Sequence, residues 1–125
     1  ALLMSARIQL NRYQREGEKP KREGMSESHL SMLRRCPCVI CGKYPSDAHH
    51  LLRTDEKGMG RRSSDKWAIS LCRVHHLALH HHGDEHAWFA EHGLDGRAIA
   101  MTLWSKRGDY DAMVRICENA AWRAR

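Results

Sequence analysis

The chain has 125 residues, which is about the length of one domain, and 42% of them are hydrophobic, as is usual for a globular protein. No apolar run approaches the ~20 residues that a membrane-spanning helix requires, so no membrane partner is expected. Lysine and arginine outnumber aspartate and glutamate by 21 to 15, and the net charge of +6 favours a polyanionic partner such as DNA.

Residues 1–25 are predicted to form an arm that precedes the main domain. Apolar residues recur among polar ones over 1–17, which indicates an amphipathic helix, and the charged stretch around Pro20 indicates a linker. The first apolar run is too short for a signal peptide. The basic residues of the arm favour a contact with DNA, whereas the glutamates among them disfavour it, so the sequence leaves the role of the arm open.

Short elements separated by turn residues are predicted between Ser26 and Leu71. Ser26 or Ser28 can cap a helix that ends before Pro37. The glycines and prolines that follow leave room only for strands too short to build a large sheet. In chain order this segment is expected to form a knuckle turn at 38–41, a strand at 48–51, a glycine-bearing loop and a strand at 67–71.

Helices are predicted for the rest of the chain. The first begins after Cys72 and reaches about His82, and the last three each follow an aspartate at a position typical of a helix N-cap. Residues 26–104 are expected to form the functional domain, with 105–125 as a C-terminal helix packed on it. The three N-caps are Asp84, Asp95 and Asp109, and their helices are expected over about 85–91, over 96–104, and from Tyr110 to near the C-terminus.

Two pairs of residues have the spacing of zinc ligands. Cys38 and Cys41 form a CxxC pair, and Cys72 and His75 form a CxxH pair. Two such pairs make a tetrahedral structural zinc site, whose folding free energy compensates for a small core. The thirty residues between the pairs suit a treble clef better than a simple finger. The predicted fold is therefore α+β, with a small zinc-stapled treble-clef core and flanking helices.

The other cysteines are not expected to bind this zinc. Cys36 stands too close to Cys38 in sequence to share its turn, and Cys117 lies on the last predicted helix, where a small buried residue is expected. Cysteine and histidine mixed at short spacing favour metal binding over disulfides, so a reducing cytoplasm is the expected compartment.

Four histidines are candidates for a second metal site. His49 and His50 are adjacent on the first predicted strand, while His76 and His80 lie four residues apart on a helix and therefore share a face. Adjacent strand residues point to opposite faces, so His49 and His50 need different roles. One is expected to bind the metal and the other to face a bound water or a neighbouring element, and the spacing does not say which.

Taken together, these motifs resemble a known family. The segments CVICGKYPSDAHHLLR, GMGRRSSDKWAISLCRVHHLALH and GDEHAWFAEHGLDGRAIAMTLW are similar to HNH, or ββα-metal, nucleases that carry a treble-clef zinc. The resemblance is to phage and prophage members, including nucleases that enhance phage recombination, and it covers about residues 33–104. It implies an endonuclease acting on DNA in recombination or processing, with recombination proteins as partners.

The resemblance also implies a role for each histidine. His50 matches the general base that activates water, and His49 matches a ligand of the catalytic ion, with His76 and His80 as its ligands from the helix. Histidine ligands accept Mg²⁺, Mn²⁺, Ni²⁺ or Zn²⁺, so the sequence does not identify this ion. The chain departs from the family at the middle asparagine, whose place is taken by Trp67. Asp65, two residues earlier, is expected to brace the loop or to orient His50.

Four cations in the predicted hairpin loop flank this site and are expected to position the DNA backbone, the alternative being a solvated loop. Whether the DNA is single-stranded, duplex or branched is open at this stage. These cations are Arg53, Arg61, Arg62 and Lys66.

A metal-dependent HNH endonuclease that hydrolyses DNA phosphodiester bonds is therefore the expected function. The alternative is a catalytically inactive zinc module that binds DNA or a protein partner, but such a module requires only the two zinc-ligand pairs and not the additional histidines. A metallohydrolase acting on a small substrate is disfavoured by the basic charge and by a chain too short for a deep apolar pocket.

Overall fold

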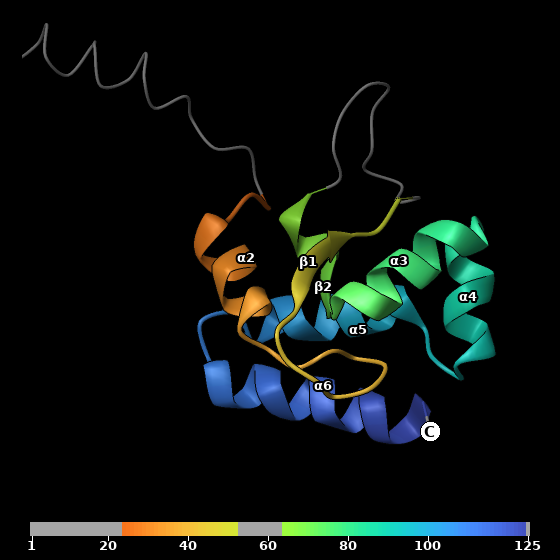
Figure 1. Cartoon of the computed structure of the whole chain (residues 1–125). Coiled ribbons are helices and arrows are strands. Elements are labelled where there is room, and N and C mark those ends of the chain that lie inside the picture. The colour runs from red at the N-terminus through yellow and green to blue at the C-terminus, as the bar shows by residue number, and fades with distance from the viewer. Residues whose placement is uncertain (1–23, 53–63, 125) are drawn as a thin grey trace, which may run out of the picture.

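The computed structural model describes residues 24–52 and 64–124, and in them helices surround a two-stranded antiparallel sheet (Figure 1). The predicted α+β class is therefore confirmed. None of the described helices is long and apolar enough to cross a membrane. In chain order the elements are α2 (Glu27–Arg34), β1 (Asp47–His50), the 3-10 turn η1 (Asp65–Trp67), β2 (Ala68–Leu71), α3 (Arg73–His82), α4 (Glu85–Glu91), α5 (Gly96–Ser105) and α6 (Tyr110–Ala124).

The helices begin where the sequence predicts, because polar side chains satisfy their first backbone N–H groups. The Ser26 hydroxyl accepts a hydrogen bond from His29 N at the start of α2. Asp84, Asp95 and Asp109 do the same for the amides three residues ahead of them. Helix α3 ends at Gly83, whose φ of 85° lies in the left-handed region that glycine adopts without strain.

The two strands are joined in a register that separates the adjacent histidines. Asp47 pairs with Leu71 and His50 pairs with Ala68. Since side chains alternate along a strand, Asp47 and His49 share one face of β1, and His50 lies on the other. This alternation decides which partners each histidine can reach.

The strand boundaries differ slightly from those predicted. Strand β1 begins and ends one residue earlier than expected, and Leu51 instead follows it, donating its N–H to Trp67 O at 2.9 Å. Trp67, predicted as the first residue of the second strand, belongs to η1, where the Ser64 hydroxyl accepts from Lys66 N. The hydrogen bond from the backbone to the serine hydroxyl competes with strand pairing at this position. The hydrophobic pattern of the sequence does not reveal such a bond.

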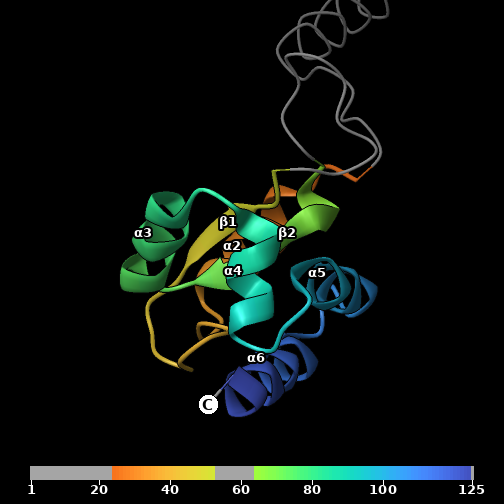
Figure 2. The same cartoon turned by 90° about the vertical axis from the view of Figure 1, so that its right-hand side faces the viewer.

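The sheet is the central element against which most helices pack. Helices α2 and α3 contact both strands, and α5 contacts β2 and η1 (Figures 1 and 2). Helix α6 runs along α5 and closes the core from below in Figure 1. The core side chains shared by these elements are fully buried, among them Leu33, Ile69, Leu71, Leu103 and Met113.

Candidate metal centres

The first cluster of metal-ligand side chains consists of Cys38, Cys41, Cys72 and His75, whose donor atoms all lie within 4.8 Å of one another. The two cysteines of the CxxC pair sit in a tight turn that is closed by the bond from Gly42 N to Cys38 O at 2.8 Å, with Gly42 at a φ of 74°. Cys72 is the N-cap residue of α3, and its thiol makes no capping hydrogen bond. The turn and the helix start thus present their donors to one point.

The spacings within this zinc-ligand cluster match a tetrahedral ion. Zinc bonds of about 2.3 Å to sulfur and about 2.1 Å to nitrogen place two tetrahedral sulfurs about 3.8 Å apart, and a sulfur and a nitrogen about 3.6 Å apart. The Sγ atoms of Cys41 and Cys72 are 3.7 Å apart, and His75 Nδ1 lies 3.8 Å from Cys38 Sγ and 3.3 Å from Cys72 Sγ. All of these thiols are free rather than disulfide-bonded.

The ligands of the zinc-ligand cluster have pKa values that are shifted in different directions. Burial raises the pKa of the Cys38 thiol to about 12, although backbone N–H groups nearby oppose the rise. Burial also acts to raise the pKa of Cys72, but the His75 backbone N–H and the thiols of Cys41 and Cys38 outweigh it and lower that pKa. Burial lowers the pKa of His75, which keeps the ring in the neutral form that binds metals. Coordination to zinc deprotonates a thiol outright, so a bound ion removes the obstacle at Cys38.

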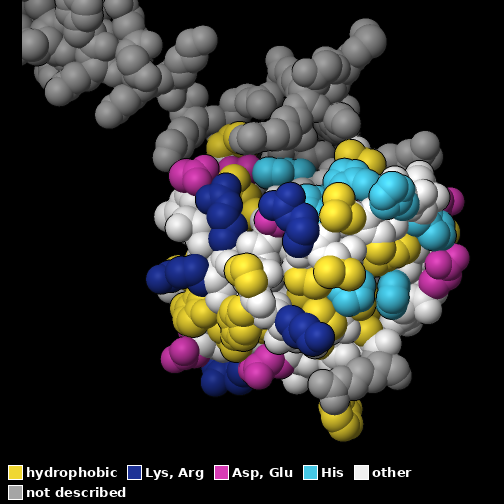
Figure 3. All heavy atoms as spheres, viewed as in Figure 1, with side chains coloured by type: hydrophobic (Ala, Val, Ile, Leu, Met, Phe, Trp, Pro, Cys, Tyr) yellow, Lys and Arg dark blue, Asp and Glu magenta, His cyan; other side chains and the backbone are white. Residues whose placement is uncertain are grey.

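A second cluster brings together His49, His76 and His80, with donor nitrogens again within 4.8 Å of one another. His49 comes from β1, and the other two come from successive turns of α3. Their ring centroids are 4.8 to 5.8 Å apart. Histidine side chains accordingly gather in one region of the surface in Figure 3, on the side where α3 lies in Figure 1. We call His49, His76 and His80 the histidine cluster.

Two carboxylates contact rings of the histidine cluster. The sequence motifs predict neither of them. Glu85 Oε1 lies 2.6 Å from His49 Nε2, and Asp47 Oδ2 lies 3.0 Å from His76 Nδ1. A carboxylate accepts hydrogen bonds, so the nitrogen that faces it carries the proton. Metal-bound histidines in proteins commonly donate their other N–H to a carboxylate in this way. Asp47 was recognisable in principle, since it lies two residues before His49 and therefore on the same strand face.

These two contacts leave His49 Nδ1 and His76 Nε2 close to each other. In the neutral rings, with protons at Nε2 of His49 and at Nδ1 of His76, the remaining nitrogens are acceptors, and they lie 3.1 Å apart. Two lone pairs at that distance repel unless a cation, a proton or a metal ion, lies between them. Metal bonds of about 2.1 Å at angles of roughly 90° to 110° hold two nitrogens about 3.0 to 3.4 Å apart, which matches the observed distance. The third histidine, His80, favours the metal ion.

His50 has a different environment from its neighbour. Its Nε2 lies 2.7 Å from Asp65 Oδ1, and the other carboxylate oxygen of Asp65 accepts from Ser26 N at 2.7 Å. Asp65 is 2% exposed, while the side chain of His50 is 19% exposed. The carboxylate holds the proton at Nε2, and Nδ1 makes no hydrogen bond to any described residue. In the neutral ring this nitrogen is the acceptor.

The loop cations are described only in part. Lys66 is half-buried and stands over the Trp67 ring, with Nζ 5.7 Å from its centroid. Arg53, Arg61 and Arg62 lie outside the described residues, as does the predicted N-terminal arm up to residue 23.

Comparison with known proteins gives a family. The model of the family described as "Protein of unknown function (DUF968)" matches residues 16–106. The chain belongs to this family. The match spans both the zinc-ligand cluster and the histidine cluster, and it ends before α6 begins.

A curated relative is the "Uncharacterized protein YdfU" of Escherichia coli (strain K12), which is 35% identical over 60 residues. Those residues are 48% of this chain but 17% of the relative, so the match spans about a sixth of that protein's length. No solved structure gives a significant match.

Proposed function

We propose that this protein is a metal-dependent HNH-type endonuclease that hydrolyses DNA phosphodiester bonds. Zinc bound by Cys38, Cys41, Cys72 and His75 forms its treble-clef core, and a divalent ion, Mg²⁺, Mn²⁺, Ni²⁺ or Zn²⁺, is held by the histidine cluster. The observation that carries this proposal is the pair of acceptor nitrogens of His49 and His76, 3.1 Å apart and each fixed by a carboxylate. A structural zinc module does not require a second set of oriented donors.

The residues around the histidine cluster divide the chemical work. When bound, the divalent ion offsets the negative charge that develops on the phosphate and on the leaving oxygen. His50 Nδ1 takes a proton from the attacking water, because Asp65 fixes the proton already present at Nε2. Asp65 then stabilises the positive charge that His50 gains. The anchoring of Asp65 by Ser26 N keeps the base in one orientation.

The different roles that we assign to His49, as metal ligand, and to His50, as general base, follow from their positions on opposite faces of β1. His49 faces α3 and its two metal-ligand histidines, whereas His50 faces η1 through Asp65. Of the two adjacent histidines, His49 is therefore the one whose ring can share an ion with α3. His50, with an acceptor nitrogen beside a carboxylate, has the arrangement of a general base. The resemblance to HNH nucleases assigns the same two roles.

The net charge of +6 and the Lys66 side chain suit a DNA substrate, with Arg53, Arg61 and Arg62 as further backbone contacts. On the resemblance to phage and prophage nucleases, we place the activity in DNA recombination or processing, with recombination proteins as partners and the cytoplasm as the compartment.

The test is cleavage of plasmid and single-stranded DNA by the zinc-loaded protein, with and without added Mg²⁺ or Mn²⁺. His50→Ala is expected to lower the cleavage rate by at least about 100-fold, the usual contribution of a general base, while zinc content and DNA affinity stay unchanged. His81→Ala is the matched control, because His81 is an exposed histidine of α3 outside the histidine cluster. Equal rates for His50→Ala and wild type contradict the assigned base. DNA binding without cleavage under any metal supports the inactive zinc module instead.

A further inference from the structure

Arg73 is an exposed cation on the face of α3 that carries two members of the histidine cluster. It is the first residue of the helix, and His76 and His80 follow it three and seven positions later, so the three side chains share one face. At 1.5 Å of rise per residue, Arg73 stands about 4.5 Å from His76 along the helix axis, which is less than one turn. Its side chain is 74% exposed. The guanidinium is therefore open to solvent beside the proposed metal site.

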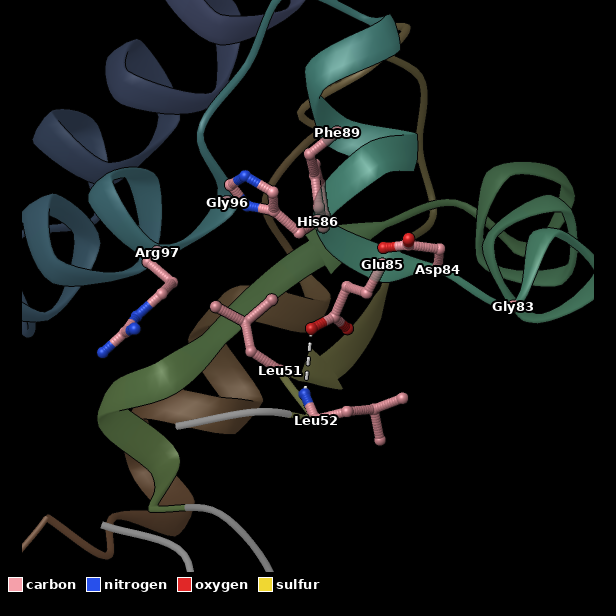
Figure 4. A pocket seen from close by; sticks show the side chains of 9 residues that line it. All are labelled: Leu51, Leu52, Gly83, Asp84, Glu85, His86, Phe89, Gly96 and Arg97. Carbon is pink, nitrogen blue, oxygen red and sulfur yellow. Dashed lines mark hydrogen bonds between the residues drawn. The ribbon is translucent and has the colours of Figure 1, made fainter. Parts of the chain in front are cut away.

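The two carboxylates that contact the histidine cluster differ in their other partners. Leu52 N donates, at 2.9 Å, to the Glu85 oxygen that does not face the cluster, so this carboxylate is taken up by the backbone (Figure 4). Asp47 contacts a cation instead. Its Oδ2 lies 3.2 Å from Arg73 Nε, and its Oδ1 accepts from Arg73 Nη2 at 3.3 Å. Because the same Oδ2 faces His76 Nδ1, Asp47 joins the guanidinium to a ring of the cluster.

The ion pair with Asp47 does not by itself explain why an arginine stands at this position. A pair with so exposed a side chain contributes little to stability, because water screens it. The first turn of a helix also favours negative charge, whereas Arg73 places a cation there. The pair uses Nε and Nη2, and Nη1 has no hydrogen-bond partner among the described residues. The guanidinium therefore keeps N–H donors for an anion.

We propose that Arg73 binds a backbone phosphate of the DNA strand that is cut, next to the phosphate at the metal ion. This inference rests on the proposed nuclease function and names a substrate contact for it. A guanidinium binds phosphate through paired N–H donors, and the contact with Asp47 orients it in advance. A divalent ion and the carboxylates of Asp47 and Glu85 sum to zero charge. Arg73 then gives this side of the site a net positive charge, which attracts a phosphodiester.

The test measures DNA affinity against salt concentration with the zinc-loaded full chain in the presence of Mn²⁺. Every protein in the series carries His50→Ala, so that the DNA is not cut. Fluorescence anisotropy gives the Kd for one labelled oligonucleotide, as a single strand and as a duplex, between about 50 and 200 mM KCl. Arg73→Ala is expected to weaken binding about tenfold at the lowest salt and to reduce the slope of log Kd against log salt by about one, as the loss of one phosphate contact does.

Arg115→Ala is the matched control, because Arg115 is an exposed arginine of α6 outside both clusters. Its Kd and its salt slope should equal those of the parent protein. In the wild-type background, Arg73→Ala should raise the KM for cleavage and leave kcat within about threefold, because a phosphate that does not react is bound equally in the ground state and in the transition state. A fall in kcat as large as that of His50→Ala would contradict the contact with a neighbouring phosphate.

Calorimetric titration with Mn²⁺ in the absence of DNA separates a phosphate contact from a role in holding Asp47. The phosphate contact leaves the Mn²⁺ affinity of Arg73→Ala close to that of the parent, whereas a loss of orientation at His76 lowers it tenfold or more. Lower Mn²⁺ affinity with an unchanged salt slope would overturn the proposal. An unchanged Kd and slope would overturn it too, while cleavage by the wild type still supports the nuclease. If the wild type neither binds nor cuts DNA, the proposed function fails and this proposal fails with it.

Discussion

Glu85 is the residue that joins the histidine cluster to the backbone at the end of β1. Its carboxylate joins His49 to the backbone of Leu52, and its side chain is 14% exposed, so little water competes for it. A carboxylate in this position fixes the ring orientation and raises the basicity of the nitrogen that meets the metal. The sequence offers Glu85 only as an acidic residue in the first turn of a short helix, because nothing local shows that this helix folds back onto β1.

Glu85→Gln should weaken metal binding at the histidine cluster about tenfold or more, since the amide keeps the shape of the side chain but removes the negative charge. The measurement is calorimetric titration of the zinc-loaded protein with Mn²⁺ or Co²⁺. Glu91→Gln is the control, because Glu91 is a more exposed carboxylate of the same helix that contacts His82 instead. Equal affinities for the two variants would show that His49 needs no carboxylate to be oriented.

Helix α3 is the element that ties the two clusters together. Its N-terminus supplies Cys72 and His75 to the zinc-ligand cluster, and its next turns supply His76 and His80 to the histidine cluster. A zinc ion bound to this cluster would therefore do more than stabilise a small core. It would also fix the position of α3 relative to β1, and so the distance between His49 and the helix histidines.

Cys41→Ser is expected to abolish stoichiometric zinc binding and to lower the thermal unfolding midpoint by far more than an ordinary core substitution. The reason is that structural zinc contributes roughly 10 kcal/mol or more to the folded state. Zinc content by elemental analysis and thermal unfolding by circular dichroism provide the measurement. Cys36→Ala is the matched control, because Cys36 is buried but stands outside the cluster.

The control variant should lose some stability through a small cavity and still retain one zinc per chain. If Cys36→Ala lost zinc as completely as Cys41→Ser, the assignment of Cys38 and Cys41 to the knuckle would be wrong.

The sequence predicts these elements well where the chemistry is local. Serine and aspartate caps, the glycine that ends α3 and the i, i+4 spacing of His76 and His80 are all properties of a few adjacent residues. What it does not predict depends on tertiary contacts. Asp47 and Glu85 acquire their roles only when α3 and α4 meet β1, and the 3-10 turn that carries Asp65 arises from the serine cap at its start.

At the scale of the whole molecule, both clusters lie within a single unit of small size. The sheet has only two short strands, so the histidine cluster depends on the helices that surround it for its position. The family match over residues 16–106 covers this unit. The aligned residues make up 17% of the curated relative.

A metal titration separates the two proposed metal ions, a structural zinc ion and a catalytic ion, by their effects on folding and on cleavage. Metal-stripped protein is refolded with increasing Zn²⁺ up to one equivalent, and Mn²⁺ is then added while plasmid nicking is followed. The first equivalent should restore the folded state without nicking, and Mn²⁺ should then bring nicking that is lost in His76→Ala. Full nicking at one equivalent of zinc, or no nicking after both metals are bound, would contradict the account.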